Sequence, residues 1–575
     1  MNTDSRSLPS VMPRAMYRLA GLCLLVGVCG GVAAVLFDGA VRLTQAGLLG
    51  GIAGYWPPQA GVLHPTPVIP QGLQRWWLPL VTALGGLISG VIVYRWAPEA
   101  EGHGTDAAIA AYHQHGGTVR YRIPFVKAIA SALTIGSGGV AGKEGPTAQI
   151  SVGIGAMLAG ALGLRGQERR ILLLAGMAAG LAAIFKAPLG MAIFSVEILY
   201  SGMVFESEAL IYTVIASVSA YAVHGFYAGW SPIFAIPQGL TFHQPLALLG
   251  FAVLGCLAGL IGAGLPSLFY WQRDLFRRLP LLPHFRPAIG GLLVGLIAVA
   301  FPAVLGTGYG WVELALAENL PLTAMLLYLL LRGPAMSLTI GSGGSGGVFG
   351  PVLSIGAMLG GVVGWALGAL APAAHLEPAS FVLVGMAAVF AGAARTPIST
   401  LIMVAEMTGG YGLIVPTMLA NIIAFLVARS LTEGRSYPTL YESQVDCRED
   451  SPIHRGVFVR RAFQMLEGGA VSDAQLTLPR LVSLLQLGEP ISITGRHEML
   501  VQLRVAEGSS LSGRTVREAF AELDGATAVA VLRGEEMLVP RGPTCFEAGD
   551  QVIVVTTGSA YEQLQKAVAS PPSSA

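Results

Sequence analysis

The chain has 575 residues, of which 53% are hydrophobic and only 12% are charged, with a mean hydropathy of +0.64. A soluble domain carries about 25% charged residues, so the composition excludes a soluble globular protein and indicates several membrane crossings. The net charge of +1 gives no reason to expect a nucleic-acid partner, and the five cysteines are spaced for neither a metal site nor a disulfide framework.

Residues 1–18 are polar and mildly basic, which predicts a short interfacial helix. Three of the apolar runs that reach membrane-spanning length are Leu19–Phe37, Leu246–Leu265 and Pro287–Val304. Arginines before the first run predict a cytoplasmic amino terminus, and we expect the carboxyl terminus on the same side of a bacterial inner membrane. Many other apolar segments are too short to cross alone, which is typical of transporters with discontinuous helices.

A glycine-rich stretch, Gly136–Gly142, leads into Gly142-Lys143-Glu144-Gly145-Pro146. Proline suits the first turn of a helix, and a helix that begins here points unpaired N–H groups and its positive dipole end at the glycines. Such a helix start attracts an anion, and the nearest one is the carboxylate of Glu144. The segment therefore predicts a gate, in which Glu144 competes with a dissolved anion for one site.

An internal repeat organises the membrane part. Leu133–Gly139 recurs letter for letter as Leu338–Gly344, and Gly142-x-Glu144-x-Pro146 is followed at the same spacing by Gly347-x-Phe349-x-Pro351. We expect an all-α polytopic membrane domain over residues 1–447, built from two inverted repeats at roughly 19–228 and 245–441, with the substrate between them. Glu197 and Glu406 follow matching prolines, Pro188 and Pro397, and we expect them to cap or brace helices.

The composition changes after Tyr441. We expect a helical linker over 448–495 with two amphipathic helices at 457–487, a small cytoplasmic α/β domain over 496–569, and a disordered tail at 570–575. The elements predicted in the α/β domain are strand Met499–Ala506, helix Thr515–Leu523, strand Thr527–Leu532, strand Gln551–Thr556 and helix Ser559–Val568. His113 and His115 lack helical spacing, and we interpret both as surface residues.

These motifs resemble those of the CLC family of chloride channels and proton-coupled chloride transporters. Gly142–Pro146 is similar to the family's G(K/R)EGP segment, Gly347–Pro351 to its GxFxP segment, and Tyr441 to its pore tyrosine. The resemblance implies a homodimer in which Glu144 is the gate, Val348 and Phe349 offer backbone N–H groups, and Tyr441 offers a hydroxyl. The implied filter residues are Gly102, Gly104, Gly142, Lys143, Gly145, Pro146, Gly347, Gly350 and Pro351.

Two positions depart from the family pattern. His103, in Gly102-His-Gly-Thr-Asp106, replaces the serine that would bind the anion, and its imidazole can still donate an N–H group. Its protonation would make binding pH-dependent, which leaves the preferred anion open. Ile198 stands where proton-coupled members usually have an inner glutamate, so a channel and an exchanger with another proton route both remain possible.

The carboxyl-terminal region resembles the C-terminal lobe of the regulator-of-potassium-conductance fold, which implies a regulatory role with an unknown ligand. We therefore expect passive or proton-coupled transport of chloride across the cell membrane, without enzyme activity, cofactor or metal. The alternatives are a transporter of fluoride, nitrate or another anion, and an intramembrane serine hydrolase. The hydrolase would use Ser345 in Gly343-Gly-Ser-Gly-Gly347, which fits G-x-S-x-G.

Overall fold

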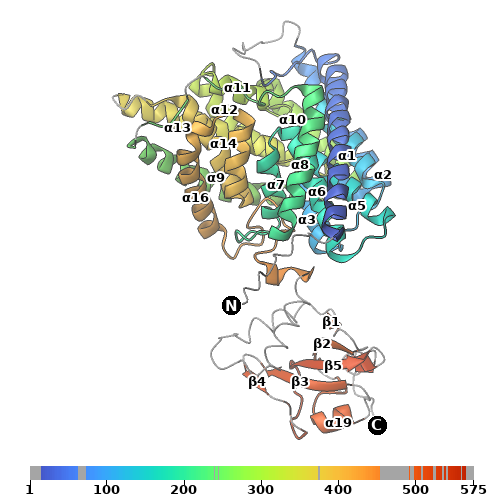
Figure 1. Cartoon of the computed structure of the whole chain (residues 1–575). Coiled ribbons are helices and arrows are strands. Elements are labelled where there is room, and N and C mark those ends of the chain that lie inside the picture. Colours follow the sequence, from blue (N-terminus) through green and yellow to red (C-terminus); the bar gives the residue numbers. More distant parts are fainter. Residues whose placement is uncertain are drawn as a thin grey trace, which may run out of the picture. The chain divides into compact units, whose positions relative to one another are not determined.

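The computed structural model describes residues 14–575 apart from 62–72, 238–239, 244, 373–375, 454–490, 493–497, 507–508, 522–525, 534–535, 539, 541, 558–559, 562 and 565–575. The chain forms two compact units, Met1–Cys447 and Arg448–Ala575. The first is helical, and the second contains a β-sheet (Figure 1). The predicted linker helices, the tail and most of the predicted helix 559–568 lie outside the described residues.

The first half of the membrane unit contains eight α-helices among its described residues. They are α1 (Arg14–Gln45), α2 (Leu78–Trp96), α3 (Thr105–His113), α4 (Ile123–Gly136), α5 (Glu144–Ala161), α6 (Gly166–Phe185), α7 (Pro188–Glu197) and α8 (Ser207–Ala228). The second half contributes α9 (Ala247–Arg278), α10 (Arg286–Ala300), α11 (Tyr309–Leu316), α12 (Leu322–Gly341), α13 (Phe349–Leu370), α14 (Pro378–Ala394), α15 (Pro397–Thr408) and α16 (Ile414–Thr432).

The two halves repeat one arrangement, as the sequence predicts. Helices α1 and α9 are both 32 residues long, α5 packs on α6 as α13 packs on α14, and α1 contacts α8 as α9 contacts α16. Glycines allow these close contacts: a Cβ at Gly155 would strike the carbonyl of Leu172, and one at Gly356 would strike that of Gly385. The internal repeat is therefore present in the packing of the helices as well as in the amino-acid sequence.

Within the described residues, eight helices are long and apolar enough to cross a membrane. Four more apolar helices, α4, α7, α14 and α15, have only 10–17 residues, which confirms the expectation of short, discontinuous pieces. One local prediction is wrong: His113 is buried at the end of α3 rather than on the surface. Of the interfacial helix predicted over residues 1–18, only 14–18 are described, and they form the start of α1.

The second unit is a five-stranded antiparallel sheet in the order β1-β2-β5-β3-β4. Its elements are β1 (Ile491–Ser492), β2 (Glu498–Arg504), α19 (Val516–Phe520), β3 (Ala526–Arg533), β4 (Glu536–Leu538) and β5 (Gln551–Thr557). Three strands and one helix lie where the sequence predicts them, whereas β1 and β4 were not predicted. Thr515 caps α19 in a capping box with Glu518.

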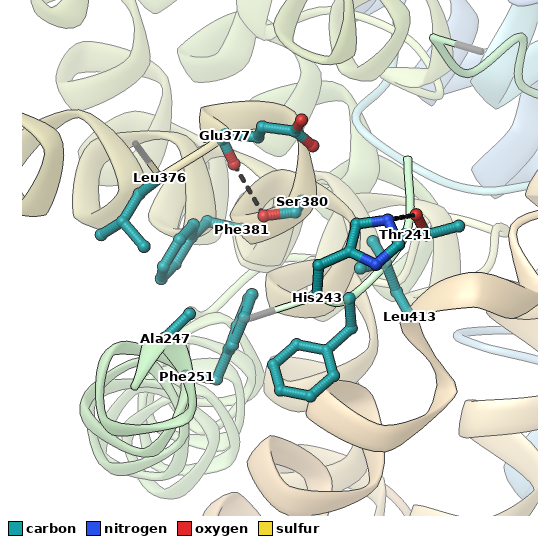
Figure 2. Close-up of a pocket in the computed structure, with 10 residues that line it drawn as sticks. Thr241, His243, Ala247, Phe251, Leu376, Glu377, Ser380, Phe381 and Leu413 are labelled. Atoms are coloured by element: carbon teal, nitrogen blue, oxygen red, sulfur yellow. Dashed lines mark hydrogen bonds between the residues drawn. The ribbon is translucent and has the colours of Figure 1, made fainter. Parts of the chain in front are cut away.

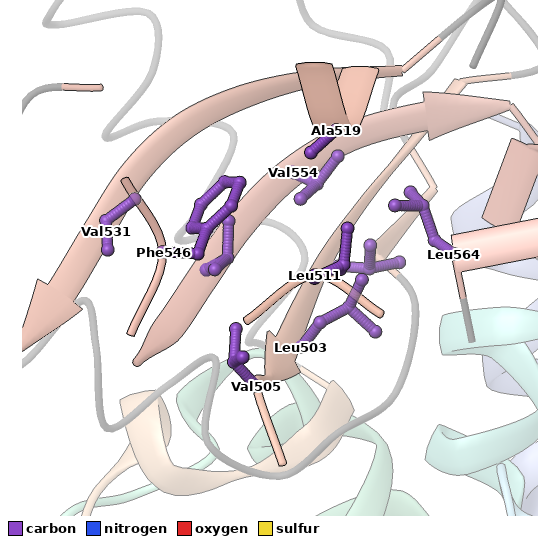
Figure 3. Close-up of a cluster of buried hydrophobic side chains, with 10 residues drawn as sticks. Leu503, Val505, Leu511, Ala519, Val531, Phe546, Val554 and Leu564 are labelled. Carbon is purple, nitrogen blue, oxygen red and sulfur yellow. The ribbon is translucent and has the colours of Figure 1, made fainter. Parts of the chain in front are cut away.

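The core of this unit is an apolar cluster between the sheet and the segments that cover it (Figure 3). Val501, Leu503, Val531 and Val554 come from the three long strands, while Phe546 lies in the segment before β5. Beside this core, Asp550 is 1% exposed and accepts hydrogen bonds at 2.9 Å from Nε and at 2.9 Å from Nη2 of Arg533. The backbone N–H of Glu547 donates to it at 2.8 Å.

Asp550 leads to a stability prediction. Burial alone would raise the pKa of this carboxyl, but the hydrogen bonds from Arg533 and Glu547 outweigh burial and hold the pKa below its usual range. A lowered pKa stabilises the fold above the unfolded-state pKa of about 4, and that stability is lost as the pH falls further. We expect Asp550→Asn to lower the local free energy of unfolding by about 1–3 kcal/mol at pH 7.

Amide hydrogen exchange of β5 in the full-length protein measures this effect. The matched control is Glu547→Gln, which breaks an exposed ion pair with the same arginine and should change stability by less than about 1 kcal/mol. Equal exchange rates in Asp550→Asn and wild type would contradict the prediction.

Candidate functional site at the converging helix starts

Three glycine segments from the two halves meet in the membrane unit. Gly142 and Gly347 exchange backbone hydrogen bonds at 2.7 and 2.8 Å. Gly102 donates to the carbonyl of Gly344 and accepts from Gly346, both at 3.2 Å. Helices α3, α5 and α13 all begin within these segments. The structure thus brings together the three filter segments that the sequence predicts.

No side chain caps the starts of these helices. The residues that precede them, Gly104, Lys143 and Val348, form no capping hydrogen bond through a side chain. Three sets of backbone N–H groups and three positive dipole ends therefore lie close to one another, which favours an anion. Glycine is required here, because a Cβ at Gly142 would collide with the carboxylate of Glu144.

Glu144 itself occupies this position. Its side chain is 0% exposed, and its Oε1 accepts a hydrogen bond from the hydroxyl of Tyr309. Its Oε2 lies next to Gly142 and close to the first turn of α13 at Gly350. The carboxylate therefore faces the other half of the protein rather than lipid or bulk water, as a competitor for an anion site must.

His103, in the first glycine segment, lies beside Tyr441. Their rings meet edge to face with centroids 5.3 Å apart, and Phe269 packs against the imidazole at 5.6 Å. His103 is 8% exposed and Tyr441 is 2% exposed. Within the described part of the chain, neither His103 Nδ1 nor the Tyr441 hydroxyl forms a hydrogen bond of ordinary geometry. Buried polar atoms normally have partners, so both are available to a ligand.

Phe349 contributes its side chain to packing. Its ring stacks on Phe390 with centroids 3.8 Å apart and also contacts Phe185 at 4.6 Å and Phe194 at 5.3 Å. The ring forms an apolar wall at the start of α13, and only the backbone of Val348 and Phe349 is left for a polar contact. This arrangement agrees with the division predicted from the repeat, in which one half supplies a charge and the other does not.

Comparisons with known proteins identify the membrane unit. The sequence profile of the voltage gated chloride channel family matches residues 85–429, and that of the TrkA-C domain matches residues 500–569. The H(+)/Cl(-) exchange transporter ClcA of Salmonella typhimurium is 31% identical over 418 residues, which cover 71% of this chain and 88% of that relative. The chain belongs to the voltage-gated chloride channel family.

Solved structures of this family share the fold. A slow cyanobacterial Cl-/H+ antiporter superposes with a TM-score of 0.65 at 24% identity, covering 79% of this chain and 99% of that one. A CLC-type fluoride/proton antiporter superposes with a TM-score of 0.62 at 22% identity, covering 76% of this chain and 99% of that one. Both similarities support the helical architecture predicted from the repeat.

Sequence reasoning missed Lys127. This side chain of α4 is 0% exposed, and its Nζ donates to the carbonyl of Ala100 at 3.0 Å and to that of Gly102 at 2.6 Å. Among the described residues no carboxylate pairs with it. A lone lysine in the apolar stretch Ile123–Gly136 is the signal that could have found it, because an intramembrane charge is rarely without a function.

The structure does not support the hydrolase alternative. Ser345 lies between two helices, α12 and α13, rather than between a strand and a helix. Its hydroxyl donates to the carbonyl of Ala100 at 2.8 Å and lies 2.9 Å from that of Ser131, so no base activates it in the described contacts. Ser345 instead helps to join the first glycine segment to the second half.

A cavity of about 380 Å³ lined by basic side chains lies beside the site; it is called the outer cavity below, because the family resemblance implies that Glu144 is an outer gate. Arg42, Lys143 and Lys186 line it together with a single aspartate, Asp38, to which Lys143 Nζ donates at 2.5 Å. Tyr309 lines the same cavity and contacts Glu144. In this family member, a positively charged hollow therefore leads to the Glu144 carboxylate.

A second hollow, of about 90 Å³, lies near the starts of α9 and α14 (Figure 2). The rings of Phe251 and Phe381 stack at its base with centroids 4.4 Å apart, and the Ser380 hydroxyl donates to the carbonyl of Glu377 at 2.7 Å. None of the residues that line it belongs to the three glycine segments. This hollow is separate from the candidate site.

Glu197 and Glu406 form reciprocal caps between the two halves. Glu197, at the end of α7, accepts the N–H groups of Ile398 and Ser399 at 3.2 and 2.8 Å, and also the Ser399 hydroxyl. Glu406, on α15, accepts the N–H groups of Leu189 and Gly190 at 3.1 and 2.8 Å. Each carboxylate thus caps the start of the other's helix, which confirms the predicted capping role.

Removing either cap should destabilise the membrane unit. We expect Glu197→Ala to lower the free energy of unfolding by about 2–4 kcal/mol, because it leaves buried N–H groups unsatisfied, and Glu406→Ala by about 1–2 kcal/mol. Thermal unfolding in detergent measures both. The control is Glu433→Gln on the exposed end of α16. A melting temperature of Glu197→Ala equal to that of the control would contradict the capping role.

Proposed function

We propose that the protein transports chloride across the cell membrane through the site between the glycine segments, with Glu144 as the gate. The observation that carries the proposal is the buried Glu144 carboxylate at three converging helix starts. The carboxylate fills the space beside these backbone N–H groups that an anion would need, so displacement of Glu144 opens the site. The sequence identity with an H(+)/Cl(-) exchange transporter supports chloride as the transported ion.

Four residues are proposed as direct anion ligands. Val348 and Phe349 offer backbone N–H groups at the start of α13, where no side chain competes for them. Tyr441 offers its hydroxyl and His103 a ring N–H group; both side chains are buried, and neither atom forms a hydrogen bond of ordinary geometry with the described residues. The imidazole of His103 is larger than a serine hydroxyl and should change which anion fits. The relative transport rates of chloride, nitrate and fluoride therefore measure the contribution of His103 to selectivity.

Proton coupling needs a route that avoids Ile198. This side chain is 0% exposed, and its carbonyl accepts a hydrogen bond from Gln444 at 2.8 Å. The position therefore holds an apolar residue that cannot carry a proton. We propose proton-coupled exchange, as in the named relative, with a passive channel as the alternative.

Reconstituted liposomes with a pH gradient decide between exchange and a channel. The reversal potential of a channel follows the chloride gradient alone, whereas that of an exchanger shifts when only the pH gradient changes. Flux of fluoride and nitrate in the same liposomes tests the remaining substrate alternatives. If the reconstituted protein transports fluoride but not chloride, chloride is not the substrate.

The family resemblance supports a proposed oligomeric state, and the basic residues near the amino terminus support a proposed orientation in the membrane. We propose a homodimer with one pathway in each subunit, in the inner membrane, with both termini in the cytoplasm. The basic residues at the start of α1 support this orientation. Residues 448–495 are proposed as a linker and 496–569 as a regulatory domain for a ligand not yet identified, consistent with the TrkA-C match.

A further inference from the structure

The turn before α11 is held in one conformation. Gly306 and Gly308 have φ angles of +73° and +91°, in the region that side chains rarely adopt. Arg332 of α12, which is 0% exposed, donates to the carbonyl of Val304 and, at 2.7 Å, to that of Gly306. A Cβ at Gly308 would lie 2.6 Å from Nη2 of Arg332. The turn therefore fixes the position of the next residue, Tyr309.

Tyr309 lies between the outer cavity and the gate. It is 8% exposed, its ring meets Phe234 edge to face at 5.5 Å, and its hydroxyl donates to Oε1 of Glu144. It also lines the basic outer cavity. A phenol hydroxyl has one hydrogen and can serve only one strong acceptor at a time. Whatever replaces the Glu144 carboxylate at this position will meet that same donor.

We propose that the Tyr309 hydroxyl is an anion ligand at the outer end of the pathway, used in turn by the Glu144 carboxylate and by the anion that displaces it. This inference rests on the proposed gate. When Glu144 occupies the site, the hydroxyl binds the carboxylate. When Glu144 leaves, the hydroxyl donates to the anion arriving from the cavity lined by Arg42, Lys143 and Lys186. Tyr309 is then the outer counterpart of Tyr441.

If the Tyr309 hydroxyl binds both the Glu144 carboxylate and the transported anion, its removal should affect chloride affinity differently with and without Glu144. Removing the hydroxyl weakens both bound states, so chloride affinity in the presence of Glu144 should change little. Without Glu144, the loss falls on the anion alone. The charged and titratable groups around the pair are Lys143 on the same segment, Arg332 of α12 and Tyr441 beyond α16. None of these is altered by the removal of one hydroxyl.

The test is chloride binding to the purified full-length protein by titration calorimetry. We expect Glu144→Ala/Tyr309→Phe to bind chloride about 10- to 100-fold more weakly than Glu144→Ala, the range for a hydrogen bond to a charged group. Tyr55→Phe in the same Glu144→Ala background is the matched control, because Tyr55 is also buried but does not contact Glu144. A change below about twofold with Tyr309→Phe would overturn the ligand role.

A second measurement uses flux with Glu144 intact. Tyr309→Phe removes a donor that favours the ionised carboxylate, so the pH at half-maximal chloride flux should rise by about 0.5–1 unit. Tyr309→His keeps a ring donor and should shift the midpoint less. An unchanged midpoint in Tyr309→Phe would also count against the proposal, and this comparison remains available if the double variant does not fold.

The two hypotheses fail in different ways. If Glu144→Ala leaves flux and its pH dependence unchanged, the gate itself is wrong. If Glu144→Ala removes the pH dependence but Tyr309→Phe does not weaken chloride binding in that background, the gate stands and only the ligand role of Tyr309 is rejected.

Discussion

Alanine in place of Glu144 is expected to raise chloride flux at neutral pH and to remove most of its pH dependence. The carboxylate is buried at the starts of helices that otherwise present unpaired N–H groups to an anion. Hydrogen bonds to a charged group contribute about 1.5–3 kcal/mol each. Losing such a competitor should increase anion occupancy about 10- to 100-fold at pH 7.

Chloride efflux from liposomes at pH 4.5 and 7.5 measures this effect. Glu144→Gln should behave similarly, because a neutral amide imitates the protonated carboxyl. The matched control is Glu313→Gln on α11, another buried carboxylate, which accepts the N–H group of Ala235 at 2.9 Å. If both Glu144 variants keep the wild-type ratio of efflux at the two pH values, Glu144 is not the gate.

The second large effect is expected for Lys127→Met. Its ammonium holds two carbonyls of the segment that carries His103 and supplies a buried positive charge. A unit charge about 8 Å from an anion is worth about 2 kcal/mol at an effective dielectric constant of about 20. With the loss of two hydrogen bonds, chloride affinity should fall about 30-fold or more.

Calorimetric chloride binding to Lys127→Met tests this expectation, with size-exclusion chromatography to confirm that the variant is folded. Lys186→Met is the comparison variant and should lower chloride affinity less, because Lys186 also donates to two backbone carbonyls, those of Ala228 and Ser231, but lines the outer cavity rather than a glycine segment. Lys127→Arg should retain part of the affinity, since it keeps the charge. Wild-type affinity in a folded Lys127→Met protein would show that the buried charge does not act on the anion.

The parts of the site that could be predicted are those with a local signal. The glycines and proline of Gly142–Pro146 and Gly347–Pro351 predict helix starts. Because the segments belong to an internal repeat, they are also predicted to occupy equivalent positions in the two halves of the fold. The buried Glu144 carboxylate and the caps from Glu197 and Glu406 followed from the same reasoning, because each depends on a helix end that the sequence itself marks.

The residues that were missed depend on contacts between distant segments. Tyr309 lies 165 positions from Glu144 in the chain, and nothing in Gly306–Gly310 indicates where its hydroxyl points. His113 was wrongly placed on the surface, because its burial depends on the turn after α7, where the Leu199 carbonyl lies 3.1 Å from Nε2. Strands β1 and β4 have two and three residues, too few for an alternating pattern to be visible.

The mutual caps of α7 and α15 bear on how the protein arose. When two identical chains associate about a two-fold axis, a contact from residue i to residue j is always accompanied by one from j to i. Glu197 and Glu406 make such a pair of contacts inside a single chain. The bond between the halves could therefore have existed in a dimer of an ancestral half-length protein, before gene duplication and fusion joined its subunits.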